Sequence, residues 1–297
     1  MGEDIMNIAI TGASGFIGRF LSSRLERQGH QIFPVGRSLL LKENKNELAK
    51  LLSNCDAVIN LAGTPIRTRW TKDKKRLILE SRTSVTQSIV ETINGLARKP
   101  SNFISASAVG IYPSEDMVAF DEESIRQGTG FLSDVCRSWE KEAMKISRDV
   151  RCVVTRFGVV LDPSGGAFPT MIAPLKFGIS AIIGRGDQPL AWISLNDLAR
   201  AFEFILLNAS IRGIVNLTAP SRTTSGSFAD ETASRRHPWI TLRIPSWLLK
   251  LTMGESASVI LTGQWVIPRK LLDAGFIFSD PDMRSYLDNI NPVSSTS

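Results

Sequence analysis

The sequence predicts an α/β fold, a doubly wound parallel sheet with a smaller C-terminal lobe. Three observations predict this fold. A glycine-rich turn separates a short apolar run from a helical pattern within residues 7–29. Further short apolar runs then alternate with helical patterns up to about residue 160, an order typical of parallel strands connected by helices. The chain has 297 residues, which is long enough for one large domain and a smaller one.

The first predicted elements flank the glycine turn. Residues 8–10 are apolar and suit a strand buried on both faces. The apolar positions from residue 17 predict a helix, which Gly29 closes as a C-cap. Because glycines let the backbone approach an anion and a helix N-terminus offers unpaired N–H groups, the turn indicates the phosphate site of a Rossmann domain rather than a turn without a ligand. The residues predicted to form this site are Gly12, Ser14, Gly15, Phe16, Ile17 and Gly18.

The second predicted strand, residues 31–35, indicates which nucleotide binds. Pro34 cannot donate a ladder hydrogen bond and is unusual there. In an NAD site, the end of this strand usually carries an acidic residue for the ribose 2′-hydroxyl, whereas here the strand ends in Gly36, Arg37 and Ser38. Since a guanidinium suits a 2′-phosphate, the sequence favours NADP(H) over NAD. The alternative is an exposed loop arginine without a ligand.

Two further strands end at the same predicted edge of the sheet. Residues 56–63 and 102–107 predict buried strands whose C-terminal ends face the cofactor crevice. Long helices are predicted at residues 72–96 and 131–147, and another strand at residues 151–156. Small residues at the strand ends let a nucleotide lie against the backbone, and an arginine on the first of these helices suits a phosphate or a ribose. The predicted cofactor contacts in this region are Leu61, Ala62, Gly63, Arg82 and Ser105.

The pattern changes past residue 160. A helix is predicted at residues 197–207 and a late strand at residues 213–220. We therefore expect residues 6–160 to form an NADP-binding Rossmann domain, whose sheet is completed by parts of residues 190–220. We expect residues 161–297 to form a smaller substrate lobe together with the C-terminal region.

Composition and charge exclude several classes of protein. Apolar residues make up 43% and charged residues 22% of the chain, as in ordinary globular proteins, and no apolar run is long enough to span a bilayer. The N-terminus lacks the features of a signal peptide, so we expect a cytoplasmic protein without a membrane partner. The basic run at residues 67–76 predicts a solvated helix face rather than a nucleic-acid site. His30, His237 and the three cysteines have no ligand spacing, which excludes a His-rich metal site.

Several motifs resemble the extended short-chain dehydrogenase/reductase superfamily, which includes NAD-dependent epimerases and dehydratases. These motifs lie at residues 11–18, 60–63, 105–112 and 192–197. A narrower resemblance, to an epimerase-like, YfcH-type branch, rests on residues 78–82, 131–132, 139–140, 156–161, 165–166, 216–220, 253–255, 264–268 and 275–276. The resemblance implies NADP(H) binding, with Gly36, Arg37, Leu61, Ala62, Arg82 and the backbone around Val159 lining the cofactor. It also implies oxidoreductase or epimerase activity on a small molecule of the nucleotide-sugar kind.

The usual catalytic pair of that superfamily is missing from this sequence. Most active members use Tyr-x-x-x-Lys, in which the lysine lowers the pKa of the tyrosine for proton transfer. Neither Tyr112 nor Tyr286 is followed by a lysine four residues later. When the helix at residues 131–147 is aligned with its counterpart in the superfamily, Leu132 and Cys136 stand where the tyrosine and the lysine are expected.

The proton for a hydride-transfer reaction must therefore come from another group. We predict Ser107 and Tyr112 as the catalytic candidates, because both follow a strand that reaches the crevice. Ser133, Asp134 and a bound water are further candidates. The alternative for Ser107 is an ordinary strand-end serine, and for Tyr112 it is a packed side chain with a satisfied hydroxyl.

Three hypotheses about function follow. The first is an NADP(H)-dependent oxidoreductase or epimerase-like protein with an unknown small-molecule substrate. The second is a non-catalytic NADPH-binding redox sensor or regulator, which contacts a partner through residues 221–297. The third is a hydride-independent isomerase or lyase on the same fold. The sequence leaves open whether the protein is a monomer or a homodimer.

Overall fold

A parallel sheet forms the centre of the molecule, and the computed structural model describes residues 5–66, 68–115 and 117–290. Position 67, in the predicted basic run, lies outside the described residues. The strands of the sheet are β1 (Asn7–Thr11), β2 (Gln31–Val35), β3 (Ala57–Asn60), β4 (Asn102–Ala108), β6 (Arg151–Phe157) and β11 (Gly213–Leu217). Their order is β11-β6-β4-β3-β1-β2, and all neighbours are parallel. The predicted α/β fold is therefore confirmed.

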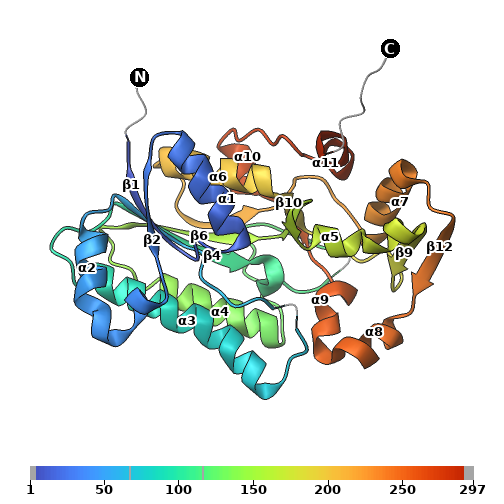
Figure 1. Cartoon of the computed structure of the whole chain (residues 1–297), viewed down its shortest axis with the longest axis horizontal. Helices are drawn as coiled ribbons and strands as arrows, with labels where there is room; N and C mark the ends of the chain where they lie inside the picture. Colours follow the sequence, from blue (N-terminus) through green and yellow to red (C-terminus); the bar gives the residue numbers. More distant parts are fainter. Residues whose placement is uncertain (1–4, 67, 116, 291–297) are drawn as a thin grey trace, which may run out of the picture.

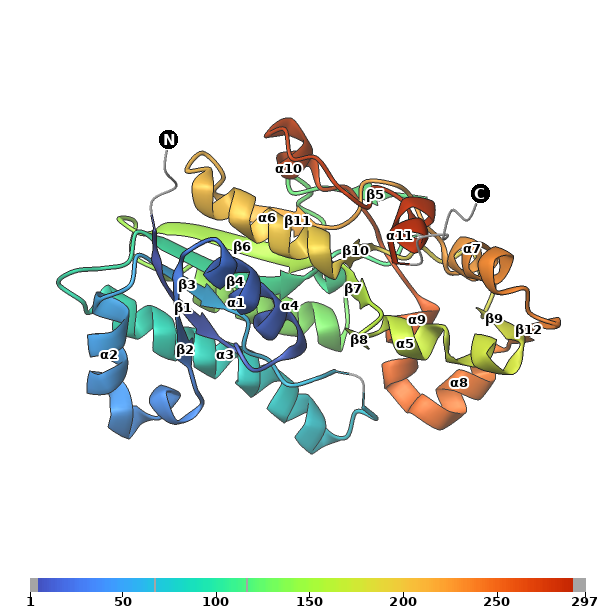
Figure 2. The ribbon, with the colours of Figure 1, turned by 45° about the horizontal axis from the view of Figure 1, so that its top comes forward.

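Helices cover both faces of this sheet (Figures 1 and 2). One face carries α1 (Phe16–Arg27) and α6 (Leu195–Leu207), and the other carries α2 (Lys45–Ser53), α3 (Lys72–Asn94) and α4 (Phe131–Ala143). In β1, Ile8 and Ile10 join the apolar core that includes residues of α1 and α6, while Ala9 joins the core that includes residues of α2 and α3. The apolar run in β1 thus supplies both layers, as expected for a parallel strand.

The observed element bounds differ a little from the predicted ones. The two long helices end at Asn94 and Ala143, a few residues before the predicted ends at 96 and 147. Helix α1 ends at Arg27, and Gly29 follows its C-cap with a φ of 93°. Pro34 is tolerated because β2 lies at the edge of the sheet and pairs only with β1.

Three small sheets extend the fold beyond the central one. One contains β7 (Val159–Asp162), β8 (Gly165–Gly166) and β10 (Trp192–Ser194), a second pairs β9 (Ile179–Ile183) with β12 (Ile240–Ile244), and a third pairs β5 (Ala119–Phe120) with β13 (Trp265–Val266). Parts of residues 190–220 were expected to complete the central sheet. Within this range, β11 joins the central sheet and β10 joins the small sheet with β7.

The helices after residue 160 lie in two places. At one end of the molecule, α5 (Phe168–Met171), α7 (Ser225–Arg236), α8 (Ser246–Met253) and α9 (Ser258–Leu261) gather around β9 and β12 (Figures 1 and 2). In contrast, α10 (Arg269–Asp273) contacts β11 of the central sheet. Helix α11 (Met283–Ile290) packs on α7. The division into domains at residue 160 stays a prediction.

Helix α10 and the segment after it are anchored on the core that β1, α1 and α6 share. Leu271, Phe276 and Phe278 belong to the same core as β1, α1 and α6. The Asp197 carboxylate, fully buried at the start of α6, accepts hydrogen bonds from the backbone N–H groups of Ser279 at 2.9 Å and Asp280 at 2.8 Å. These contacts tie the C-terminal region to the central sheet.

No helix among the described residues is both long enough and apolar enough to cross a membrane.

Arg151, the first residue of β6, caps the C-terminal end of α6. Its guanidinium is buried and donates to the carbonyl oxygens of Ile205 at 2.9 Å, Asn208 at 2.8 Å and Ile211 at 3.1 Å. Its Nε donates to the Asn102 side chain at 2.7 Å. The last carbonyls of a helix lack partners within the helix, and a cation also suits the negative end of the helix dipole.

We predict that Arg151→Met lowers the free energy of unfolding by about 2–4 kcal/mol, because it leaves several buried carbonyl oxygens without donors. Urea denaturation followed by circular dichroism measures this change. Arg148→Met is the matched control, since Arg148 is exposed on the same loop, and we expect almost no change there. Equal stability of the two variants would contradict the capping role.

Candidate functional site

The glycine turn between β1 and α1 has no room for side chains. Gly12 has a φ of 70°, a conformation that favours glycine. A Cβ atom on Gly12 would lie 2.9 Å from the carbonyl oxygen of Leu61, and a Cβ atom on Gly18 would lie 2.2 Å from the carbonyl oxygen of Gly12. The turn is therefore pressed between the end of β3 and the first turn of α1.

The N-terminus of α1 offers backbone donors to an anion. Gly15 is its N-cap, and no side chain caps the first N–H groups. Ser14 is exposed beside them, whereas Ile17 packs against the core and the ring of Phe16 lies against the backbone of Gly165. The turn thus presents N–H groups, a hydroxyl and the positive end of a helix dipole in one place, which is the arrangement that binds phosphate.

The end of β2 lies beside this turn. Val35 is in register with Thr11, the last residue of β1, so the chain leaves β2 next to the glycine turn. Gly36, Arg37 and Ser38 follow and are all exposed. Within the described part of the chain, the Arg37 guanidinium forms no ion pair. Its charge is therefore available to a ligand at this edge of the sheet.

Arg82 on α3 brings a second positive charge to the carboxyl edge of the sheet. Its guanidinium donates to the carbonyl oxygens of Thr64 at 3.1 Å and Ile78 at 3.0 Å. It lies so close to Gly63 that a Cβ atom there would be 3.0 Å from the guanidinium carbon. These contacts fix the side chain at the end of β3, where the sequence predicted a cofactor contact.

No carboxylate among the described residues neutralises Arg82. The guanidinium carbon lies 5.2 Å from the centre of the Trp139 ring. Burial lowers the pKa of Arg82, and its electrostatic interaction with the Cys136 side chain opposes this shift only in part. The Nε1 of Trp139 is buried without a hydrogen-bond partner. A partly buried cation without a counter-ion is unfavourable, so this position suits an anionic or hydroxyl-rich ligand.

A row of buried polar side chains crosses the sheet just below this edge. The Thr11 hydroxyl donates to Asn60 Oδ1 at 2.7 Å, and Asn60 Nδ2 donates to Ser105 Oγ at 3.3 Å and to Thr86 at 2.8 Å. The Ala62 N–H donates to Asn60 Oδ1 at 3.4 Å. Ser105, a predicted cofactor contact, is thus part of an internal network that connects the ends of β1 and β3 to the middle of β4.

Ser107 at the end of β4 is held by a buried ion pair. Its hydroxyl donates to Glu140 Oε1 at 2.6 Å. The Arg156 guanidinium donates to both oxygens of the same carboxylate at 2.8 Å. All three side chains are buried, and in register Ser107 lies beside Arg156, which in turn lies beside Asn216. The Ser107 proton is therefore bound to Glu140 inside the protein.

The hydroxyl of Tyr112 is likewise used inside the protein. Its oxygen lies 2.9 Å from the Asp121 carbonyl oxygen and 3.0 Å from Asn216 Oδ1. The Arg156 guanidinium covers its ring, 4.8 Å from the ring centre. Tyr112 is 1% exposed, and burial raises the pKa of its hydroxyl. This geometry matches the packed alternative for Tyr112 rather than a side chain that presents its hydroxyl to a substrate.

The other predicted proton donors are also engaged. Ser133 is buried, and its hydroxyl donates to the Gly128 carbonyl oxygen at 2.8 Å. Asp134 pairs with Arg137 at the surface of α4. Cys136, at the position predicted for the lysine, is buried, and burial raises the pKa of its thiol to about 12. Among the candidates within the described residues, none is left as an exposed, unpaired acid or hydroxyl.

Sequence reasoning missed Glu140, Arg156 and Asn216. All three appeared only as parts of family motifs, without a role. The available signal was chemical: a carboxylate and a guanidinium lie at positions of α4 and β6 that otherwise carry core residues. Ionised side chains in a core are nearly always paired. The sequence therefore indicated that Glu140 and Arg156 pair with each other, but it did not indicate that Ser107 binds to the pair.

Val159 is the last predicted cofactor contact, and His30 and His237 are the only histidines of the chain. Val159 begins β7, and its N–H donates to the Ala191 carbonyl oxygen at 2.8 Å, so this backbone donor is already paired. His30 accepts from the Met6 N–H, and His237 adopts a φ of 45° at the end of α7. No group of three potential metal ligands occurs within the described ranges.

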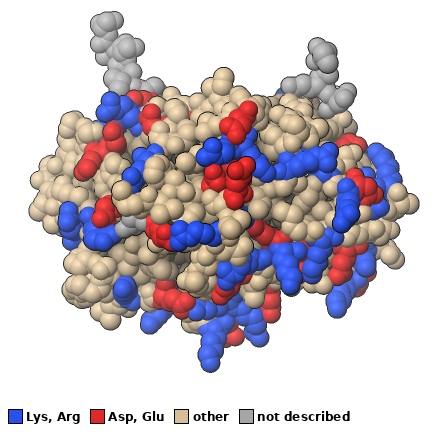
Figure 3. Space-filling model, turned by 180° about the vertical axis from the view of Figure 1, so that it is seen from behind, with Lys and Arg blue, Asp and Glu red and all other residues tan. Residues whose placement is uncertain are grey.

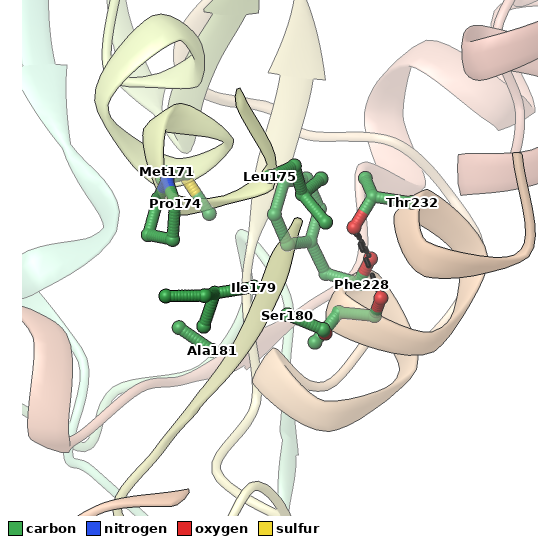
Figure 4. A pocket seen from close by; sticks show the side chains of 9 residues that line it. Met171, Pro174, Leu175, Ile179, Ser180, Ala181, Phe228 and Thr232 are labelled. Carbon is green, nitrogen blue, oxygen red and sulfur yellow. Dashed lines mark hydrogen bonds between the residues drawn. The ribbon is translucent and has the colours of Figure 1, made fainter. Parts of the chain in front are cut away.

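Two small hollows lie away from these residues, among elements that follow residue 160. Figure 4 shows one of them, into which Met171, Leu175, Ile179 and Phe228 project; its volume is about 10 Å³, roughly the space of one water. The second hollow has a volume of about 100 Å³. Neither hollow includes the glycine turn, Arg37 or Arg82.

Charged side chains are mixed on the rear face. In Figure 3, lysines and arginines gather along the lower edge, where α3 lies in Figure 1, with acidic residues between them. Near the start of α3, Arg76 pairs with Asp73 and Lys75 pairs with Glu255 of the C-terminal region. This mixture agrees with a solvated helix face.

Comparisons with known proteins cover almost the whole chain. Residues 8–217 match the model of the NAD dependent epimerase/dehydratase family, and residues 244–290 match a domain of unknown function. Epimerase family protein YfhF of Bacillus subtilis is 36% identical, with 96% of this chain and 98% of that protein covered. The chloroplastic homolog of epimerase family protein SDR39U1 from Arabidopsis thaliana is also 36% identical, with 93% and 84% covered.

Solved structures show the same fold. The crystal structure of human epimerase family protein SDR39U1 with NADPH has a TM-score of 0.89 and 31% identity, with 96% of this chain and 99% of that chain covered. UDP-glucuronic acid 4-epimerase from Bacillus cereus, in complex with UDP-glucuronic acid and NAD, has a TM-score of 0.74 at 20% identity, with 97% and 99% covered. At that identity, the second likeness concerns the fold alone.

Glu122 lies beside β11, the edge strand of the central sheet that carries Asn216. Its Oε1 accepts from the backbone N–H groups of Asn216 at 2.9 Å and Lys270 at 3.4 Å, while its Oε2 is buried without a partner. Burial raises the pKa of Glu122 above its ordinary value of 4.5, and the hydrogen bonds oppose this shift only in part. The folded state therefore binds a proton here more tightly than the unfolded chain does.

We predict that Glu122 makes stability depend on pH. A carboxyl whose pKa is raised on folding stabilises the protein below its unfolded pKa, and this contribution is lost as the pH rises through the folded pKa. Relative to Glu122→Gln, the wild type should therefore lose stability as the pH rises from about 4.5 through the raised pKa of the folded state. Thermal unfolding across this range measures the difference. Glu123→Gln, at an exposed neighbouring position, should follow the wild type, and a parallel curve for Glu122→Gln would refute the assignment.

Proposed function

Because this chain belongs to the NAD dependent epimerase/dehydratase family, we propose that it is an NADP(H)-binding oxidoreductase or epimerase-like protein that acts on a small molecule. The family membership confirms the resemblance that the motifs predicted. The observation that carries the proposal is the crowded glycine turn at the N-terminus of α1. Backbone N–H groups without partners and glycines that admit no side chain are the requirements of a dinucleotide phosphate site.

We assign the 2′-phosphate of the cofactor to Arg37. The side chain follows β2, next to the glycine turn, where an NAD-binding protein usually has an acidic residue. Arg37 is exposed and has no ion pair within the described residues, so a phosphate gains a charge-assisted contact without breaking one. The human relative that was solved with NADPH supports this choice of cofactor.

We assign the other end of the cofactor to the carboxyl edge of β3 and β4. Leu61, Ala62 and Gly63 offer backbone and small side chains there, and the Arg82 guanidinium lies under Gly63. Arg82 would donate to a phosphate oxygen or a ribose hydroxyl. A phosphate oxygen there would balance the positive charge of Arg82, which no carboxylate in the described part of the chain neutralises.

The proposed reaction needs a hydride and a proton, and the residues of the site position the groups that supply them. NADP(H) supplies a hydride donor or acceptor when it is bound. The ion pair of Glu140 and Arg156 keeps the ends of β4 and β6 rigid, which fixes the wall against which a substrate would lie. Because Ser107 and Tyr112 already bind acceptors inside the protein, we propose that a water or the substrate itself supplies the proton.

The internal hydrogen bonds of Ser107 and Tyr112 favour a second candidate function, a non-catalytic NADPH-binding redox sensor. A sensor needs the phosphate site and Arg37 but no proton donor, and the structure leaves neither Ser107 nor Tyr112 with a hydroxyl directed away from internal acceptors. In both cases the ligand beside the cofactor is a small molecule or a partner that remains to be identified by assay. Cytoplasmic location stays a prediction, and one plant relative is described as chloroplastic.

We predict that the wild type binds NADPH at least about tenfold more tightly than NADH, since a charge-assisted phosphate contact contributes about 1.5–3 kcal/mol. Arg37→Ala should remove this preference by weakening NADPH binding and leaving NADH binding unchanged. Isothermal titration measures both affinities. Arg27→Ala, at the far exposed end of α1, is the control and should keep the preference. Equal affinities for the two nucleotides in the wild type would exclude the 2′-phosphate assignment.

We predict, as the test between the two functions, that the purified protein oxidises NADPH with at least one member of a panel of carbonyl compounds. Absorbance at the reduced nicotinamide band follows the reaction. Ser107→Ala and Tyr112→Phe should retain turnover, because neither hydroxyl is the proton donor in this proposal. Tight NADPH binding without oxidation across the panel would favour the sensor instead.

A further inference from the structure

The C-terminal lobe has an apolar and cationic face at one end of the molecule. We call the exposed side chains of residues 176–177 and 239–251, together with Arg236, the basic apolar face. They come from the end of η4 (Ala173–Phe177), from β12, from α8 and from the last turn of α7. These elements lie together at the same end of the molecule in both ribbon views (Figures 1 and 2). The face is separate from the glycine turn and the proposed cofactor site.

Large apolar side chains on this face are open to solvent. Trp239 is 92% exposed, Phe177 74%, Leu251 69% and Trp247 65%. The Trp239 ring lies against Gly178, the residue that follows Phe177 in the chain. Helix α8 has eight residues and none of them is buried. A surface helix normally buries one apolar stripe in its own domain, so this face is one that a partner is expected to cover.

The charge of this face has one sign. Between Glu231 and Glu255 the sequence contains no aspartate or glutamate, but it contains three exposed cations on the face, Arg236, Arg243 and Lys250. None of these three pairs with a carboxylate in the part of the chain that the structure describes. The face therefore complements an anionic surface. A second copy of this chain is a poor partner, because a symmetric contact would bring like charges together.

A hollow adjoins the face. The cavity of about 100 Å³ is lined by four apolar side chains, by Thr232 and by Lys176, Arg235 and Arg236. Of these cations, Arg235 pairs with Glu231 and Asp288. Lys176 directly precedes Phe177, so the cationic side of the cavity borders the exposed aromatic side chains. An apolar cavity with cations at its border suits an amphiphile that carries a negative charge.

We propose that the basic apolar face binds the surface of a membrane that contains anionic phospholipids. Tryptophan side chains favour the level of the headgroups, leucines favour the acyl boundary, and Arg and Lys are attracted to the phosphates. Such binding needs no membrane-spanning helix. It departs from the expectation of a protein without a membrane partner, which rested on the absence of a spanning run. The proposal is independent of whether the protein turns over a substrate.

Co-sedimentation of the full chain with vesicles tests this proposal. We expect about tenfold stronger binding to phosphatidylcholine vesicles that contain phosphatidylglycerol than to phosphatidylcholine alone, with binding weakened by added salt. Trp239→Ser with Trp247→Ser should reduce binding about tenfold, and Arg243→Glu with Lys250→Glu should reduce it as strongly. All four side chains are exposed, so the variants should retain the thermal midpoint and the NADPH affinity of the wild type.

The matched control reverses two positive charges at a site outside the basic apolar face. Lys72→Glu with Lys74→Glu reverses two exposed cations at the start of α3, outside the face, and should leave vesicle binding unchanged. An equal loss with this control, or equal binding to neutral vesicles, would overturn the proposal. So would an absence of binding to either vesicle. A dimer in sedimentation equilibrium that Trp239→Ser with Trp247→Ser abolishes would instead identify the face as an interface between copies.

Discussion

The close contact between the glycine turn, the end of β3 and the start of α1 is the constraint on which the candidate site depends. At Gly18 a single added carbon atom would overlap the Gly12 carbonyl oxygen, and at Gly12 it would crowd Leu61. Because these three backbone segments touch, the first N–H groups of α1 point to the same edge as the ends of β1 and β3. The phosphate site is thus a property of backbone packing, with side chains absent by necessity.

A buried ion pair organises the neighbouring part of the same edge. Glu140 and Arg156 join α4 to β6, and they also hold Ser107 and cover Tyr112. Removing one partner of such a pair leaves an uncompensated charge in the core, so the pair fixes its surroundings strongly. The consequence for chemistry is that the two hydroxyls most suited to proton transfer by position are bound to acceptors of the protein itself.

The sequence predicted the features that depend on local patterns, and it missed those that depend on contacts between distant residues. The glycine spacing and the apolar runs predicted the central sheet, and Arg37 followed from its place after β2, because each is a short-range signal. The partners of Ser107 and Tyr112 are Glu140 and Asn216, which lie 33 and 104 residues further along the chain. The helix and strand periodicities of a sequence do not indicate contacts between residues so far apart.

The positive charge at the carboxyl edge shows how the site differs from the superfamily pattern. Cys136 stands on α4 where the lysine is expected, and its buried thiol carries no charge at neutral pH because its pKa is raised to about 12. The Arg82 guanidinium, which interacts with that thiol, comes from α3 instead. A cation therefore remains near the expected place, but it belongs to another helix and has no tyrosine beside it. An arginine keeps its proton under all conditions in which proteins fold, so it can bind an anion or a hydroxyl there but cannot itself exchange a proton. The edge is accordingly better suited to holding a cofactor than to acid–base catalysis by its own side chains.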